Sequence, residues 1–121
     1  MLLSTRSLSW YGLDKIFALA KSAGYTGLDL SVDFALYDTL DERYLDSLMT
    51  RHDMRIESIT APERKMTKKQ VDTLLTLADD LGISLVNLHP PHRSDRDKDW
   101  FGEALKSLMA KHPSVTINIV N

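Results

Sequence analysis

The sequence predicts an α/β fold made of repeated (β/α) units with a parallel sheet. Apolar runs of strand length alternate with longer segments in which apolar residues recur at helical spacing. The return from each helix to the next strand is short, as at residues 23–28, 52–56 and 81–85. Strands that alternate with helices in this way indicate right-handed crossovers between neighbouring parallel strands.

Each predicted element follows from a local pattern. The first helical segment has one apolar face, formed by Leu13, Ile16, Phe17 and Ala20. Two Thr residues followed three positions later by Glu or Gln have the spacing of a capping box and mark helix starts. They are Thr39 with Glu42 and Thr67 with Gln70. In order, strands are expected at residues 1–7, 27–32, 54–60, 83–89 and 115–120, and helices at residues 13–23, 40–52, 68–81 and 99–111.

The number of elements predicts one (β/α) domain over residues 1–121, equivalent to about half of an eight-stranded barrel. The last expected strand carries Ile117, Ile119 and Val120 and would be an exposed edge unless something covers it. Three arrangements are open. The sheet is open, two chains complete each other as a homodimer, or the natural chain continues past Asn121.

Composition excludes several classes of protein. The chain is 43% hydrophobic and 26% charged, as in ordinary soluble globular proteins, and its formal charge of −2 disfavours a nucleic-acid partner. The absence of cysteine excludes disulfides and thiolate metal sites. No apolar run approaches the roughly 20 residues of a membrane span. No basic segment followed by an apolar region begins the sequence, so we expect a cytoplasmic protein with no membrane partner.

The fourth expected strand is followed by a polar loop with two histidines. Pro90 and Pro91 cannot continue a strand ladder, so the strand should stop at His89. Chemistry in parallel α/β folds lies just beyond the carboxyl ends of the strands. His89 is therefore a candidate metal ligand, and His92 a candidate substrate contact. The alternatives are a hydrogen-bonded strand-end histidine and a solvated loop residue, because one histidine alone does not form a metal site.

Two acidic residues inside strands are candidate catalytic groups. Glu57 could act as a base if it faces the sheet interior, but an ion pair with Arg55 on the same face is the stronger interpretation. Asp29 could belong to an interior polar network or contact a substrate. Trp10 and Tyr37 follow the first two strands, where they could line a substrate pocket or simply pack against the sheet.

Two segments resemble the xylose isomerase-like barrel superfamily, which includes sugar-phosphate isomerases and epimerases and the endonuclease IV type of DNA-repair nuclease. Residues 20–30, Ala-Lys-Ser-Ala-Gly-Tyr-Thr-Gly-Leu-Asp-Leu, look like the first helix of that family running into its second strand. Residues 87–92, Asn-Leu-His-Pro-Pro-His, are similar to the strand-end His-Pro motif of the endonuclease branch. The resemblance implies a partial TIM barrel corresponding to the amino-terminal half. It also implies a divalent metal such as Mn, Zn or Mg, with His89 as one ligand.

Two departures from the family pattern bear on activity. The endonuclease branch has a ligand histidine at the end of its third strand, where this chain has Thr60-Ala61-Pro62. The superfamily usually has a ligand Glu at the end of its fifth strand, where this chain has Val120 before Asn121. In the isomerase and epimerase branch most metal ligands come from later strands, so the resemblance bears on fold more than on activity.

The expected function is that of a metal-dependent sugar or sugar-phosphate isomerase or epimerase, if further chain or a partner completes the barrel. Two alternatives stay open. One is a non-catalytic half barrel that binds a partner or self-associates through its sheet edges. The other is a metal-dependent DNA-repair nuclease of the endonuclease IV type, which the acidic charge balance and the missing third-strand histidine disfavour.

Overall fold

The computed structural model describes residues 1–64, 66–89 and 98–120, with side chains described outside residues 98–101. Within these residues one sheet of five parallel strands has the order β1-β2-β3-β4-β5. The strands are β1 (Leu2–Ser4), β2 (Gly27–Ser31), β3 (Ile56–Thr60), β4 (Leu85–Leu88) and β5 (Thr116–Ile119). The helices are α1 (Leu13–Ser22), α2 (Glu42–His52), α3 (Lys68–Leu81) and α4 (Lys98–Lys111), with short 3-10 turns η1 (Thr5–Leu8) and η2 (Tyr37–Thr39). The predicted α/β class and the predicted partial barrel of about five strands and four helices are confirmed.

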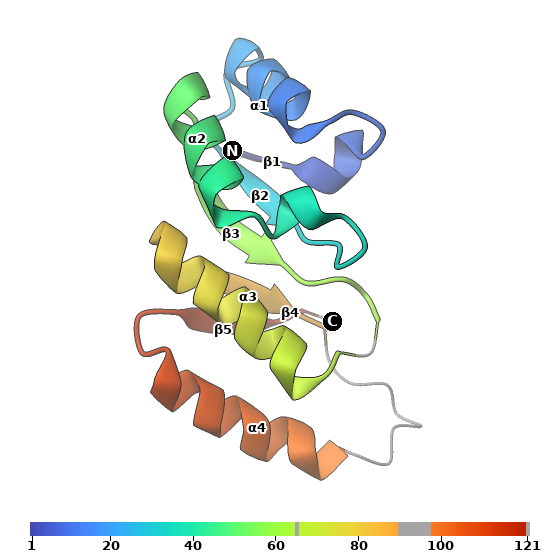
Figure 1. The fold of residues 1–121 in the computed structure, drawn as a ribbon, viewed down its shortest axis with the longest axis vertical. Coiled ribbons are helices and arrows are strands. Elements are labelled where there is room, and N and C mark those ends of the chain that lie inside the picture. Colours follow the sequence, from blue (N-terminus) through green and yellow to red (C-terminus); the bar gives the residue numbers. More distant parts are fainter. Residues whose placement is uncertain (65, 90–97, 121) are drawn as a thin grey trace.

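The helices cover one face of the sheet. Because the strands pair in sequence order and each crossover has the same hand, every connecting helix falls on the same side. Figure 1 shows the helices following one another from α1 to α4 in the same order as the strands. This is the arrangement of a barrel wall, in which helices lie outside and the other face of the sheet is the interior.

The core lies between the helices and the sheet. Alternate strand residues, including Leu28, Leu30 and Val86, are fully buried beneath the helices. The matching helix face of α1 contains Leu13, Ile16, Phe17 and Ala20, as its spacing predicts. Burial of side chains of this kind contributes about 1.5–3 kcal/mol each relative to the exposed state. Among the positions between them, Asp29, Ser31 and Asn87 are partly buried and carry polar side chains on the other face of the sheet, the interior of the barrel wall.

One of the two predicted helix starts is confirmed and the other is wrong. Thr67 accepts a hydrogen bond from the Gln70 backbone N–H, and the Gln70 side chain accepts one from the Thr67 N–H, so α3 has a complete capping box. The start of α2 is instead capped by Asp41, whose carboxylate accepts from the Tyr44 N–H. Asp41 is a strong N-cap residue immediately before Glu42, and Thr39 is engaged in the preceding turn.

Strand ends differ by a few residues from the predictions. β1 stops at Ser4 rather than residue 7, because the Ser4 hydroxyl accepts from the Arg6 N–H and starts η1. β1 and β5 are the outer strands of the described sheet, and each pairs with a neighbour on one side only. Leu2 on β1 and Ile119 on β5 are each 41% exposed. Among the described residues, no helix has the length and apolarity needed to cross a membrane.

Candidate functional site

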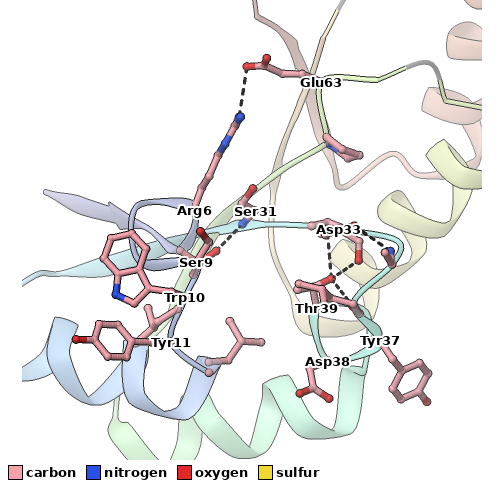
Figure 2. Close-up of a pocket in the computed structure, with 18 of the residues that line it drawn as sticks. Arg6, Ser9, Trp10, Tyr11, Ser31, Asp33, Tyr37, Asp38, Thr39 and Glu63 are labelled. Carbon is pink, nitrogen blue, oxygen red and sulfur yellow. Dashed lines mark hydrogen bonds and ion pairs between the residues drawn. The ribbon is translucent and has the colours of Figure 1, made fainter.

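An open pocket of about 890 Å³ lies over the carboxyl ends of β1, β2 and β3. Three loops form it, and Figure 2 shows their side chains around the hollow. Residues 5–13 follow β1, residues 31–39 span the end of β2 and the loop after it, and residues 62–64 follow β3. This edge of the sheet is where parallel α/β folds bind their ligands.

Aromatic side chains form part of the pocket wall. Trp10 and Tyr37, both predicted as substrate contacts, lie in the loops after different strands and line the same pocket. Each is 74% exposed, so neither serves mainly as core packing. Tyr11 lies beside Trp10, with 6.0 Å between the ring centroids. Exposed aromatic faces next to polar groups are a common feature of small-molecule sites.

The loop after β2 is fixed by internal hydrogen bonds. The Thr39 hydroxyl is buried and accepts from the Asp33 N–H at 3.1 Å. The same oxygen lies 2.8 Å from the Leu36 carbonyl, to which it can donate. The Asp33 carboxylate in turn accepts from the Ala35 N–H at 2.9 Å. A loop held in this way keeps its shape at the pocket without needing a ligand to order it.

Further contacts connect the pocket loops to one another. The Thr5 hydroxyl accepts from the Ser31 N–H at 2.9 Å, which ties η1 to the end of β2. Arg6 pairs with Glu63 at 3.4 Å across the pocket mouth, and both side chains are more than half exposed. An exposed pair of this kind contributes at most about 1 kcal/mol. Arg6 therefore stays available to a ligand.

A row of polar side chains runs across the interior face of the sheet, and we call it the polar ladder. It consists of Asp29, Ser58, Thr60, Asn87 and Asn118. The Asp29 carboxylate accepts from the Ser58 hydroxyl at 2.7 Å and from the Thr60 hydroxyl at 2.8 Å.

The ladder continues toward the last strand through amide groups. Asn87 donates to the Thr60 oxygen at 3.2 Å, and Asn118 donates to the Asn87 carbonyl oxygen at 3.0 Å. Four of the five strands are therefore joined by side-chain hydrogen bonds on the interior face.

The ladder defines the place of Asp29. Its carboxylate is half-buried and already accepts two hydroxyl hydrogens, which favours the interior-network interpretation over direct proton transfer. The other members of the ladder were not singled out from the sequence. The alternation of side chains along a strand could have identified them, because Ser58, Thr60 and Asn87 occupy the strand positions that face away from the helices.

Glu57 is not brought to this edge of the sheet. It is the second residue of β3 and lies beside Gly27, the first residue of β2, near the amino-terminal end of the sheet. The pairing of β2 with β3 shifts register between Leu28 and Asp29, which leaves Glu57 without a partner in β2. Its carboxylate lies 3.8 Å from Arg55, as the ion-pair interpretation expects. The structure therefore gives no support to Glu57 as a catalytic group.

His89 directly follows β4, as the strand-end motif predicts. Its ring nitrogen Nε2 is buried and has no hydrogen-bond partner, which makes it the one buried side-chain nitrogen or oxygen in the described structure without one. An unpartnered buried nitrogen fits a ligand donor better than a satisfied structural histidine. The second predicted histidine, His92, lies outside the described residues.

The described residues do not form a complete metal site. No group of three or more His, Asp or Glu side chains among residues 1–64, 66–89 and 98–120 is arranged to hold a metal ion. A divalent metal usually needs three or four protein ligands, and His89 supplies one donor. Any metal chemistry therefore requires ligands other than those described.

Comparison with known proteins gives matches among solved structures alone. No family model matches the chain. No curated protein matches it. The AP endonuclease, family 2, from Brucella melitensis matches with a TM-score of 0.71 at 17% identity, over 91% of this chain and 50% of that one. The xylose isomerase domain protein from Planctomyces limnophilus matches with a TM-score of 0.64 at 10% identity, over 98% of this chain and 51% of that one.

These similarities concern the fold, because both identities are low. The chain spans about half the length of each of the two solved structures. The match covers nearly all of this chain, and the strand order agrees with a barrel wall. The chain therefore has the fold of about one half of a TIM barrel, as these two structures have it.

Proposed function

We propose that this chain is the substrate-binding amino-terminal half of a xylose isomerase-like barrel that acts on a sugar or sugar phosphate as an isomerase or epimerase. Further chain or a partner subunit would supply the rest of the reaction site. The pocket at the carboxyl ends of β1, β2 and β3 is the observation that carries the proposal.

The chemistry of the pocket wall supports a polyhydroxylated ligand. The apolar C–H faces of a sugar ring can pack on exposed aromatic rings such as Trp10 and Tyr37. Sugar hydroxyls need both donors and acceptors, and the wall offers both, with the guanidinium of Arg6 and the carboxylate of Asp38 among them. A phosphate group on the ligand would find Arg6 and Arg64 at the rim.

A divalent metal, if one completes the site, would take the unpartnered Nε2 of His89 as one ligand and would polarise neighbouring carbonyl and hydroxyl oxygens of the substrate. Within the described chain, Asp29 has the role of ordering the interior face. Its hydrogen bonds fix Ser58 and Thr60, and Thr60 in turn orients the amide of Asn87. The metal and its identity belong to the proposal.

The competing nuclease function has less support from the pocket. Three of the charged side chains that line it are acidic, namely Asp33, Asp38 and Glu63, against two arginines. A DNA backbone requires a surplus of positive charge along its path. The similarity to the Brucella melitensis structure is a similarity of fold.

Tryptophan fluorescence tests the proposal directly. The sequence has two tryptophans, so a Trp100→Phe variant leaves Trp10 as the single reporter in the pocket. Titration with aldoses, ketoses and their phosphates should give a saturable change in emission for at least one class. In the same background Tyr37→Ala should weaken binding about tenfold, which corresponds to roughly 1.4 kcal/mol. Met109→Ala is the matched control, because Met109 is half exposed on α4 and is not a pocket residue.

The outcomes separate the alternatives. A saturable response that Tyr37→Ala weakens and Met109→Ala leaves unchanged supports a sugar site. No response to any sugar or sugar phosphate, or equal responses in both variants, would overturn it. A mass near twice the 13.7 kDa chain by light scattering would then favour the self-association alternative, in which two copies cover the open edges β1 and β5.

A further inference from the structure

The chain contains two segments with the same internal organisation. Residues 13–31 hold α1 and β2, residues 71–89 hold most of α3 and β4, and each residue of the first segment lies 58 positions before its counterpart in the second. The buried face of α1 repeats at this spacing in α3. The corresponding pairs are Leu13 with Val71, Ile16 with Leu74, Phe17 with Leu75 and Ala20 with Ala78.

The same spacing relates the turns that follow these helices. Gly24 has a φ of 84° and Gly82 a φ of 70°, so both use the left-handed conformation that glycine favours. Beyond them, Asp29 in β2 corresponds to Asn87 in β4, and both belong to the polar ladder.

The ends of α2 and α4 are also alike. Residues 47–52 read Ser-Leu-Met-Thr-Arg-His, and residues 107–112 read Ser-Leu-Met-Ala-Lys-His. Four of these six positions are identical, and Arg51 and Lys111 both carry a positive charge. Each segment ends its helix just before a short return to the next strand, β3 or β5.

In the first half of the chain this helix end docks on an aspartate of the preceding helix. Arg51 donates to the Asp14 carboxylate at 3.1 Å, and the His52 ring nitrogen Nε2 lies 2.6 Å from the same oxygen. We call these three residues the α1–α2 clamp. The His52 and Arg51 hydrogen bonds lower the pKa of Asp14 against the opposing effect of desolvation.

The second half repeats the contact with corresponding residues. Lys111 donates to the Asp72 carboxylate at 3.1 Å, and the His112 nitrogen Nε2 lies 2.8 Å from it. Asp72 is the counterpart of Asp14 at the spacing of 58. The other ring nitrogen of His112 contacts the Asp79 carboxylate. We call Asp72, Asp79, Lys111 and His112 the α3–α4 clamp.

General helix packing does not account for this agreement. Adjacent helices on a parallel sheet need only an apolar face toward the strands, and the polar contacts between them can vary freely. In both halves an aspartate of the first helix contacts a basic side chain and the Nε2 of a histidine at the end of the second helix. The contact of His112 with Asp79 is the addition that the second half makes.

We propose that residues 1–52 and 56–112 are equivalent (βα)₂ units, and that in each unit the clamp locks the second helix onto the first. The locks have different local consequences. The α1–α2 clamp fixes α2, which directly follows the pocket loop at residues 32–41, whereas none of the described side chains of α3 and α4 lines the pocket. The first clamp is therefore a positioning device for the pocket, and the second holds α4 against α3.

The α3–α4 clamp is also sensitive to pH. Both ring nitrogens of His112 face carboxylates, and only the doubly protonated ring can donate to both. Burial lowers the pKa of His112, but the Asp79 and Asp72 carboxylates raise it by more, so the pKa lies above its usual value. The described charged groups facing this ring are Asp72 and Asp79 from α3, while Lys111 on α4 pairs with Asp72.

Hydrogen–deuterium exchange on the full chain tests the two locks against each other. Asp14→Asn should speed exchange in α2 and in residues 32–41 by at least about fivefold and leave α4 unchanged. Asp72→Asn is the matched variant and should speed exchange in α4 while leaving residues 32–41 unchanged. If either aspartate variant fails to fold, Arg51→Gln and Lys111→Gln test the exposed arm of each clamp in the same way.

Faster exchange confined to α2 and residues 32–41 in Asp14→Asn, and confined to α4 in Asp72→Asn, supports the proposal. Exchange that rises uniformly in both variants, or that stays unchanged in both, overturns it. An NMR titration of the four histidine rings adds an independent test. The pKa of His112 should lie above the ordinary histidine value in the wild type, because of the two carboxylates, and should fall in Asp72→Asn. A His112 ring that titrates at or below about 6.5 in the wild type contradicts the lock.

Discussion

The polar ladder makes a specific prediction for Asp29→Asn. The carboxylate accepts from two hydroxyls, Ser58 at 2.7 Å and Thr60 at 2.8 Å. A hydrogen bond to a charged group contributes about 1.5–3 kcal/mol. Both hydroxyls donate to the same oxygen, which asparagine can keep, but the negative charge that strengthens both bonds is lost. The amide nitrogen also replaces the second oxygen, which lies 2.9 Å from the Thr60 hydroxyl. We therefore expect the free energy of unfolding to fall by about 1.5–3 kcal/mol.

Urea denaturation followed by circular dichroism measures this loss. With an m-value of about 1–3 kcal/mol/M for a small domain, the unfolding midpoint should move by roughly 1 M. Asp38→Asn is the matched control, because Asp38 is an exposed carboxylate at the pocket and its change should stay within about 0.5 kcal/mol. If Asp29→Asn behaves like the control, the ladder does not stabilise the sheet and the interior-network interpretation of Asp29 is wrong.

Three further changes test other parts of the structure. Thr39→Val should cost about 1–2 kcal/mol in urea denaturation, because it leaves the Asp33 N–H without its buried acceptor. Gly82→Ala should cost about 1 kcal/mol because residue 82 has a φ of 70°, whereas Gly12→Ala should be nearly neutral because an added Cβ meets nothing within 4 Å. Comparison of wild type with His112→Asn across pH should show the largest stability difference between about pH 4 and 6.5. Below that window the contribution is lost as pH falls through the lowered pKa of Asp72, and above it as pH rises through the raised pKa of His112. A difference that is constant from pH 4 to 9 would contradict the charged contact.

Local patterns predicted most of the fold. Apolar residues recur at helical spacing in α1 and α3, and the residues selected by this spacing are the ones that the structure buries. The capping box at Thr67 was predictable because both partners lie within four residues. The predicted capping box at Thr39 is wrong because Asp41, a stronger N-cap residue, lies immediately before the helix and accepts from the Tyr44 N–H.

The candidate site was predicted in part. Placing His89, Trp10 and Tyr37 at the carboxyl ends of strands required only strand boundaries, and the structure places them there. Glu57 lies toward the amino-terminal end of the sheet, and its position depends on a register shift between β2 and β3 that the sequence of β3 alone does not reveal.

Contacts between residues far apart in sequence were the least predictable. His112 lies just after the helix predicted at residues 99–111, but that prediction does not indicate that its ring is buried beside two carboxylates more than thirty positions earlier in the sequence. The clamps and the polar ladder join different elements, and periodicity within one element carries no information about such pairs. The similarity between the two halves of the sequence is the feature that could have indicated the two clamps.

The central claim is that the pocket over β1, β2 and β3 binds a sugar or sugar phosphate, and an NMR titration of ¹⁵N-labelled protein tests it most directly. Amide shifts should change saturably in residues 5–13, 31–39 and 62–64, which form the pocket, and stay constant in α3 and α4. A titration series of aldoses, ketoses and their phosphates that moves none of these amides, or that moves chiefly the outer helices, would contradict the proposed function.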